Sequence, residues 1–265
     1  GETEQAGGEG GSWGSWNQRL NFLTDTDECQ WRDTDNQGVL KGVASCDGDG
    51  RVTALQLATN GLTGTIPREI QALTAMETFG VADNGNNGAG LGGSIPPEIV
   101  NLSSLRDIRA FDNDLTGSLP SNLGELNGLT YIAMQANQLE GPMPSNIGSC
   151  TGLTDLLLQQ NEMTGELPTS MGALTNLQEL FLEDNQFSGS IPADLGNMRS
   201  LRNLWLSKND FVGGMDVFCN PEAGITLSLF YADCLGTSFP ETPPQVECSC
   251  CTICCNEDGD CLPNN

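Results

Sequence analysis

The sequence predicts a solenoid, in which stacked structural repeats build one elongated domain. An asparagine closes a leucine-spaced segment seven times, at Asn60, Asn84, Asn113, Asn137, Asn161, Asn185 and Asn209. Successive asparagines are 24 residues apart, except for one interval of 29 residues. Six of the seven units continue into a Gly-x-[Ile/Leu/Met]-Pro step. A fixed period in this range is typical of solenoids, whose function lies on a long exposed face.

Each repeat predicts a short strand followed by a bend. In one unit Leu156 and Leu158 stand on either side of Leu157. Because side chains alternate with a period of two along a strand, Leu156 and Leu158 are predicted to point inward and Leu157 outward. Full turns connect successive strands, so the strands must pair in parallel. An inward asparagine such as Asn161 is expected to hydrogen-bond backbone groups of its own and the adjacent turn. The proline step disfavours α-helix. The predicted fold class is an α/β solenoid, a leucine-rich-repeat horseshoe with one curved parallel sheet on its concave face and 3₁₀ or extended segments on its convex face.

Disulfide-stapled caps are expected at both ends, because an uncapped terminal repeat would expose its apolar cross-section. The expected regions are a flexible acidic glycine-rich segment (1–11), an N-terminal cap (12–51), seven repeats (52–215) and a cysteine-rich C-terminal cap (216–265). A short helix is expected near residues 16–23 of the first cap. The run Ile225–Ala232 in the second cap is expected to form one more strand. The segment Gly85–Ala89 accounts for the one long interval and predicts a loop.

The charge and cysteine content limit the function classes. Asp and Glu number 35 against ten Lys and Arg, for a net charge of −25, which disfavours nucleic-acid and anionic-membrane partners. No segment reaches the roughly 18–20 apolar residues of a membrane span. Eleven cysteines favour an oxidising, extracellular compartment. Ten are expected in disulfides: Cys29, Cys46, Cys219, Cys234, Cys248, Cys250, Cys251, Cys254, Cys255 and Cys261. Cys150 replaces an apolar repeat residue and predicts a buried free thiol.

Neither catalytic residues nor a cofactor are expected. The sequence has no histidine, which excludes Ser-His-Asp and Cys-His nucleophile arrangements. The spacing of Cys251 and Cys254 suits zinc, but adjacent cysteine pairs fit one tetrahedral ion poorly, so disulfides are favoured. Acidic clusters at Asp25–Glu28, Asp33–Asp35 and Asp47–Gly50 offer oxygen ligands for calcium. None completes a twelve-residue calcium loop, and solvated turns are the favoured interpretation.

The concave face is the predicted binding surface. One outward column runs through Gln56, Gly80, Arg109, Ala133, Leu157, Phe181 and Trp205. Its C-terminal half predicts an exposed apolar stripe rimmed by Asp155, Glu179, Glu183 and Asp184. The residues expected to bind a partner are Phe111, Tyr131, Leu157, Phe181 and Trp205, because exposed apolar and aromatic patches mark interaction sites. The alternative is mutual shielding, since neighbouring strands lie about 4.8 Å apart.

The Leu-x-x-Leu-x-Leu-x-x-Asn-x-Leu-x-Gly-x-Ile-Pro unit resembles the plant-type repeat of extracellular receptors and polygalacturonase-inhibiting proteins. The cap with Cys29, Trp31, Gly42-Val43 and Cys46 is similar to the N-terminal cap of that family. The run Cys248–Cys255 resembles the tails of secreted or surface repeat proteins of diatoms. These resemblances cover about residues 13–255 and imply recognition or adhesion.

The function expected from these observations is non-catalytic recognition or adhesion by a secreted or cell-surface protein. The concave face is expected to bind an extracellular protein or a polysaccharide. One alternative is a self-associating component of an extracellular matrix or cell wall, and another is the ectodomain of a receptor. The triplet Asn101-Leu102-Ser103 predicts N-glycosylation at Asn101.

Overall fold

The structure is a computed structural model that describes residues 29, 32–34, 40–85, 90–213, 215–219, 224–233, 251–255 and 261–263. Several sequence predictions lie outside these residues. They are the flexible segment 1–11, the helix near 16–23, the acidic clusters Asp25–Glu28 and Asp33–Asp35, most of the Gly85–Ala89 loop, Cys234, Cys248 and Cys250, and the side chains of Cys254, Cys255 and Cys261.

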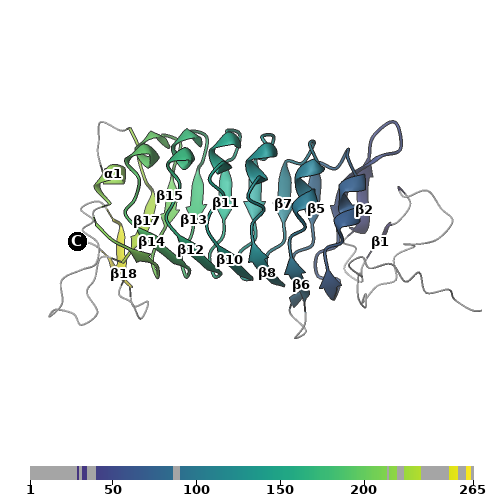
Figure 1. Ribbon diagram of the computed structural model, residues 1–265, viewed down its shortest axis with the longest axis horizontal. Helices are drawn as coiled ribbons and strands as arrows, with labels where there is room; N and C mark the ends of the chain where they lie inside the picture. The colour runs from purple at the N-terminus through teal and green to yellow at the C-terminus, as the bar shows by residue number, and fades with distance from the viewer. Residues whose placement is uncertain are drawn as a thin grey trace, which may run out of the picture.

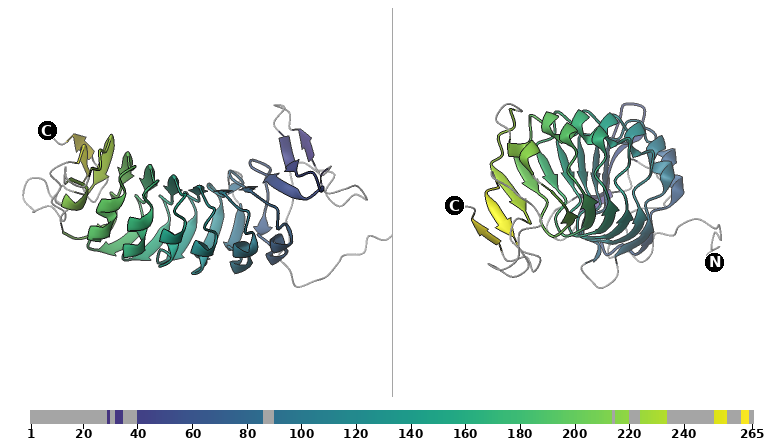
Figure 2. Two further views of the ribbon diagram at one scale, coloured as in Figure 1. Left: turned by 90° about the horizontal axis from the view of Figure 1, so that it is seen from above. Right: turned by 60° about the vertical axis from the view of Figure 1, so that its left-hand side comes forward.

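The repeats stack side by side along one axis, and the row of repeats is gently curved (Figures 1 and 2). A twelve-stranded sheet contains one strand from each repeat and continues into both caps. Its strands, in spatial order, are β1 (Arg32–Thr34), β2 (Leu40–Cys46), β3 (Val52–Gln56), β5 (Thr78–Gly80), β7 (Asp107–Arg109), β9 (Tyr131–Ala133), β11 (Asp155–Leu157), β13 (Glu179–Phe181), β15 (Asn203–Trp205), β17 (Leu229–Ala232), β18 (Ile253–Cys255) and β19 (Cys261–Pro263). All pairs from β3 to β18 are parallel, which confirms the predicted parallel sheet.

A second sheet of seven parallel strands was not predicted. It contains β4 (Gly64–Thr65), β6 (Leu91–Ser94), β8 (Asp114–Ser118), β10 (Gln138–Gly141), β12 (Glu162–Gly165), β14 (Gln186–Gly189) and β16 (Asp210–Phe211). Each strand follows the asparagine of its repeat, and in six of the seven repeats it leads into the Gly-x-[Ile/Leu/Met]-Pro step. Each is short, so the pairing of successive repeats, rather than strand length, produces this sheet.

The convex side carries short 3₁₀ helices, as the proline steps predicted. They are η2 (Arg68–Ala72), η4 (Pro97–Asn101), η5 (Leu123–Glu125), η6 (Ile147–Ser149), η7 (Thr169–Ala173) and η8 (Ala193–Asn197). Pro67, Pro96, Pro168 and Pro192 stand at the N-cap of four of them, in extended conformation. A short α-helix, α1 (Asp216–Cys219), follows the last repeat.

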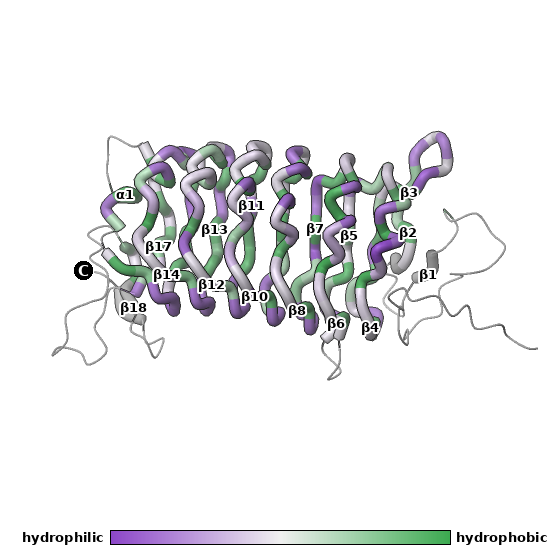
Figure 3. The backbone as a smooth tube through the Cα atoms, in the orientation of Figure 1, coloured by the Kyte–Doolittle hydropathy of each residue, from purple (hydrophilic) through white to green (hydrophobic). Residues whose placement is uncertain are grey.

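One cluster of buried apolar residues includes members from the strands of both sheets and from the 3₁₀ helices. The hydropathy colouring of Figure 3 shows hydrophobic residues recurring along the row of repeats. Leu156 and Leu158 are fully buried, in agreement with the predicted inward positions. Cys150 lies in this core as a free thiol, and burial raises its pKa to about 11. A disulfide joins Cys29 to Cys46, and Cys219 and Cys251 are also disulfide-bonded.

The asparagine ladder links successive repeats. In the Asn161 side chain, Nδ2 donates to the carbonyls of Leu158 in its own turn (3.0 Å) and Met134 in the preceding repeat (3.1 Å). Its Oδ1 accepts from the backbone N–H of Leu139, also in the preceding repeat, at 2.9 Å. The same pattern recurs at Asn84, Asn113, Asn137, Asn185 and Asn209. The predicted hydrogen-bonding role of these asparagines is therefore confirmed.

The residue before each asparagine has left-handed backbone, a feature that the sequence did not reveal. Thr59, Asp83, Asp112, Ala136, Gln160, Asp184 and Lys208 have φ between 53° and 58°. A non-glycine residue rarely adopts this conformation. Here it reverses the chain at the end of each concave strand and directs the following amide inward, where hydrogen bonds offset the backbone strain.

Candidate functional site

The outward side of strands β3 to β17, called the concave face below, carries the predicted column of side chains. Strand pairing aligns Gln56, Gly80, Arg109, Ala133, Leu157, Phe181 and Trp205 in the predicted order. The register then adds an eighth residue, Tyr231 on β17, opposite Trp205. The sequence predicted a strand here but did not place Tyr231 in the column.

The C-terminal end of this column is an aromatic cluster, defined here as Phe181, Trp205 and Tyr231. The rings of Phe181 and Trp205 stack with centroids 4.2 Å apart and planes 12° apart. Trp205 also contacts Tyr231, with centroids 5.3 Å apart and a tilt of 58°. All three side chains are half-buried. Leu229 precedes the cluster residue Tyr231 on β17 and is 39% exposed, so apolar surface extends to the neighbouring outward row.

The expected exposed stripe is too long, and its N-terminal half needs correction. Ala133 is fully buried and Leu157 is only 8% exposed, although both occupy outward positions. Side chains on adjacent strands cover these smaller residues, which is the mutual shielding that the sequence left as an alternative. The accessible apolar surface therefore begins at Phe181 and is concentrated towards Leu229 and Tyr231.

Phe111 and Tyr131, also predicted to bind a partner, lie apart from the aromatic cluster. Tyr131 is on β9, two strands from β13, in the outward row that contains Asp155 and Glu179. The guanidinium carbon of Arg109 lies 5.0 Å from the centre of its ring. Phe111 comes after the end of β7, at the third outward position of its repeat. It lies five residues before Thr116 of β8. The five predicted residues therefore do not form one contiguous patch.

Arg109 is held by a carboxylate of its own strand. Its Nε and an Nη donate to the two oxygens of Asp107 at 3.0 and 2.8 Å. This hydrogen-bonded pair raises the pKa of Arg109, and the guanidinium stays charged. Because its donors already serve Asp107, Arg109 contributes less positive potential to the face than a free cation would.

Acidic side chains flank the aromatic cluster on both sides. Asp155 and Glu179 occupy the outward row before the cluster. Glu183 and Asp184 come just after the C-terminal end of β13, on the other side of the cluster. Glu179 Oε1 accepts a hydrogen bond from Asn203 Nδ2 at 3.0 Å. Lys208 is the cation that acts on Glu183. The predicted acidic rim is thus present in the structure.

Three buried polar atoms on the concave face have no hydrogen-bond partner among the described residues. They are Trp205 Nε1, Gln135 Oε1 and Gln159 Oε1. Buried polar groups of folded proteins are nearly always satisfied, and exceptions often lie at functional sites. The unpaired indole N–H belongs to the aromatic cluster, and its nitrogen lies below the accessible surface of the face.

Glu183 has an unusual acidity. Burial raises the pKa of its carboxyl group to about 7, the charge of Asp184 adds to the rise, and Lys208 opposes it. Because the folded-state pKa lies above the unfolded-state value, the unfolded chain loses its proton first as pH increases. Glu183 therefore reduces the stability of the folded state as the pH rises from about 4.5 to 7.

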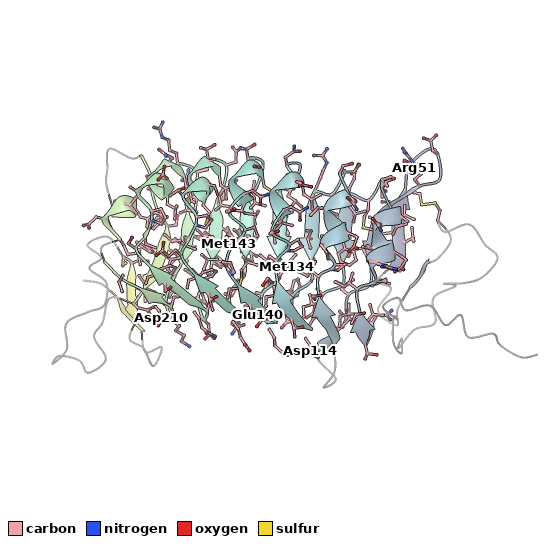
Figure 4. All side chains as sticks on the ribbon, viewed as in Figure 1. Arg51, Asp114, Met134, Glu140, Met143 and Asp210 are labelled. Carbon is pink, nitrogen blue, oxygen red and sulfur yellow. A yellow bond between two sulfur atoms is a disulfide. The ribbon has the colours of Figure 1, made fainter. Side chains whose placement is uncertain are left out.

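Glu183→Gln is expected to raise the melting temperature at pH 8 and to change it little at pH 4, where the Glu183 carboxyl is mostly neutral in both states. Thermal unfolding followed by circular dichroism at the two pH values measures this difference. Glu140→Gln removes an exposed carboxylate from the seven-stranded sheet and is the matched control (Figure 4). An equal gain from both variants at pH 8 would assign the effect to general charge repulsion.

The remaining predicted sites are placed as follows. Asp47 Oδ1 accepts from the backbone N–H groups of Asp49 and Arg51, and its carboxylate pairs with Arg51. This cluster therefore acts as a turn, and among the described residues no group of three or more potential ligands could hold a metal.

Asn101 ends η4 with an exposed side chain that donates to Gln71 Oε1, and its glycosylation stays a prediction. In the part of the chain that the structure describes, no helix could cross a membrane.

Comparisons with known proteins agree with this architecture. Residues 176–198 match the family model described as Leucine Rich Repeat. Over 91 residues, which are 34% of this chain and 9% of the relative, the sequence is 33% identical to the receptor-like kinase TMK2 of Arabidopsis thaliana. The plant peptide hormone receptor RGFR1 in complex with RGF2 has a similar structure, with a TM-score of 0.61 and 29% identity, over 69% of this chain and 28% of that chain.

A plant ice-binding protein has the same fold, with a TM-score of 0.64 over 88% of this chain and 72% of that protein, at 24% identity. This likeness concerns the fold alone, because one solenoid carries different functions on different surfaces. The chain spans less than a third of the kinase and of the peptide receptor to which it is similar. The fold is a leucine-rich-repeat solenoid of the kind found in extracellular plant receptors.

Proposed function

We propose that this protein is a non-catalytic extracellular recognition module that binds a protein or peptide through the C-terminal half of its concave face. The observation that carries the proposal is the aromatic cluster of Phe181, Trp205 and Tyr231, continued by the exposed Leu229. Aromatic side chains are the commonest anchors of protein interfaces. The three rings of the cluster do not enter the core, because the register of the sheet points these side chains outward.

The ring geometry favours a peptide over a glycan. Phe181 and Trp205 cover one face of each other, and Tyr231 lies against Trp205 on the following strand. A sugar that stacks on an aromatic residue needs a free ring face, whereas apolar side chains pack well against ring edges.

The similarity to a plant peptide hormone receptor supports the same class of partner. The disulfide between Cys29 and Cys46 supports an extracellular location, because such bonds persist in oxidising compartments.

A double variant tests the site. Peptides selected from a random display library on the wild-type protein are expected to bind Phe181→Ala/Trp205→Ala at least about tenfold more weakly, a loss of about 1.4 kcal/mol. Fluorescence anisotropy of labelled peptides measures the dissociation constants. Loss of the stacked pair removes about 1 kcal/mol of ring–ring interaction, in addition to the burial of two half-buried side chains. Circular dichroism checks that the double variant is folded before its binding is compared.

Two further variants keep this test informative. Leu229→Ser alters an exposed residue beside the cluster and is expected to weaken binding several-fold without affecting folding. Val212→Ala alters a 56% exposed residue just after β16 of the seven-stranded sheet and is expected to leave binding unchanged. Peptides that bind all variants equally would contradict the proposed face. Sedimentation over a concentration series checks self-association, the alternative use of an exposed apolar patch.

A further inference from the structure

We infer that the concave face selects an extended segment that carries both apolar and cationic side chains on the side turned towards the aromatic cluster. The apolar side chains pack on the aromatic cluster, and lysine or arginine side chains reach the carboxylates on both sides. This inference rests on the proposed function and names the chemical class of the partner. It follows from the arrangement of charge around the cluster, from the orientation of the rings and from the environment of Glu183.

The charge around the cluster has one dominant sign. Asp155 and Glu179 stand in the outward row on one side, and Glu183 and Asp184 on the other. Lys208 is near Glu183, and Arg109 is paired with Asp107 four strands from Trp205. Alternate residues of a strand are about 6.6 Å apart, so the carboxylates lie within reach of long side chains from a segment on the cluster. An acidic segment here would meet like charges on both sides.

The rings direct cations to the carboxylates. A cation–π contact requires the cation above a ring face. The contact between Phe181 and Trp205 covers one face of each, and Tyr231 is tilted against Trp205. Cationic groups therefore gain most from Glu179 and Glu183, while ring edges accept apolar side chains. This division predicts that apolar and cationic side chains occur together on the side of the partner that contacts the face.

Glu183 adds a pH-dependent component to this selection. Its carboxyl faces Asp184 and Lys208, and its outward neighbours on the adjacent strands are Gln159 and Ser207, which carry no charge. A cation placed beside Glu183 favours the ionised carboxylate. Binding is therefore coupled to loss of the Glu183 proton, and affinity is expected to rise as the pH increases from 5.5 to 8.

Model peptides test the charge selection directly. The probe is a labelled peptide of four Leu-Lys-Ser units, and the comparison peptides contain Leu-Glu-Ser or Ser-Lys-Ser units of the same length. Fluorescence anisotropy at low ionic strength is expected to show binding of the first probe at least about tenfold tighter than that of either comparison peptide. Added salt is expected to weaken this binding, because the contacting charges are partly exposed.

Matched variants of the full chain separate the site from the overall negative charge. Glu179→Gln/Glu183→Gln is expected to weaken binding of the Leu-Lys-Ser peptide about tenfold and to abolish its rise with pH. Glu140→Gln/Glu162→Gln removes the same charge from two paired, exposed positions on the seven-stranded sheet, and is expected to change the affinity less than twofold. Figure 4 shows Glu140 on that sheet, among the outer acidic side chains.

Three results would overturn the inference. They are equal weakening by the two double variants, equal binding of the Leu-Lys-Ser and Leu-Glu-Ser peptides, and unchanged pH dependence in Glu179→Gln/Glu183→Gln. The proposed function is judged separately by the library-selected peptides. If these lose affinity for Phe181→Ala/Trp205→Ala but not for Glu179→Gln/Glu183→Gln, the concave face binds a partner without selecting its charge.

Discussion

Gly148→Ala is expected to destabilise the protein by about 3 kcal/mol, at the upper end of the effects of overpacking. Gly148 lies in η6, and an added Cβ would lie 2.0 Å from the backbone oxygen of Ser170 in η7. No side-chain rotation relieves a contact with backbone. The convex turns of two successive repeats would have to separate, which weakens the nearest-neighbour contacts that stabilise a solenoid. Urea unfolding followed by circular dichroism measures the loss.

The same close approach occurs at other convex turns. A Cβ on Gly124 would lie 2.0 Å from the Asn146 oxygen, and one on Gly172 would lie 2.4 Å from the Asp194 oxygen. Gly152→Ala is the matched control, because its Cβ would lie 3.5 Å from the Leu129 oxygen, an ordinary contact. The free energy of unfolding of that variant is expected to lie within about 0.5 kcal/mol of the wild-type value. Similar losses for Gly148→Ala and Gly152→Ala would show that close backbone packing on the convex side is not the cause.

Asn161→Leu is expected to destabilise the protein by about 3 kcal/mol. Leucine has a similar volume but cannot replace the bonds from Asn161 to Met134, Leu158 and Leu139. Each buried backbone group left without a partner costs about 1–3 kcal/mol. Because these partners belong to two repeats, the substitution weakens both the turn and its contact with the preceding repeat. Thermal and urea unfolding both measure this change.

Asn60→Leu is the control that the ladder itself provides. Asn60 has the same type of position, is only 1% exposed, and neither atom of its side-chain amide has a partner in the described structure. It stands at the first repeat, where no preceding repeat supplies a carbonyl. Its replacement breaks no side-chain hydrogen bond and removes a buried polar group, so stability is expected to stay within about 1 kcal/mol of the wild type or to increase. An equal loss at Asn60 and Asn161 would mean that side-chain shape, and not hydrogen bonding, matters at these positions.

Much of this architecture could be read from the chain. The 24-residue period gave the solenoid, the alternation around Leu157 gave the inward positions, and the asparagines gave the register. These predictions succeed because a repeat protein is stabilised by neighbouring copies of one local pattern. The left-handed residues were not predicted, since Ala136 and Lys208 show no local preference for positive φ. The second sheet was missed as well, because its short strands depend on pairing between repeats.

The sequence by itself determined the fold, the order of the outward column and the negative charge around Phe181 and Trp205, since each follows from period and composition. The tertiary structure decided which of those residues are accessible. It buried Ala133 and Leu157, separated Tyr131 from the aromatic cluster and added Tyr231 and Leu229. The physical reason is that exposure depends on the size of side chains on adjacent strands, 24 or more residues away in the chain. Packing across strands, and not position along one strand, therefore defines the face available to a partner.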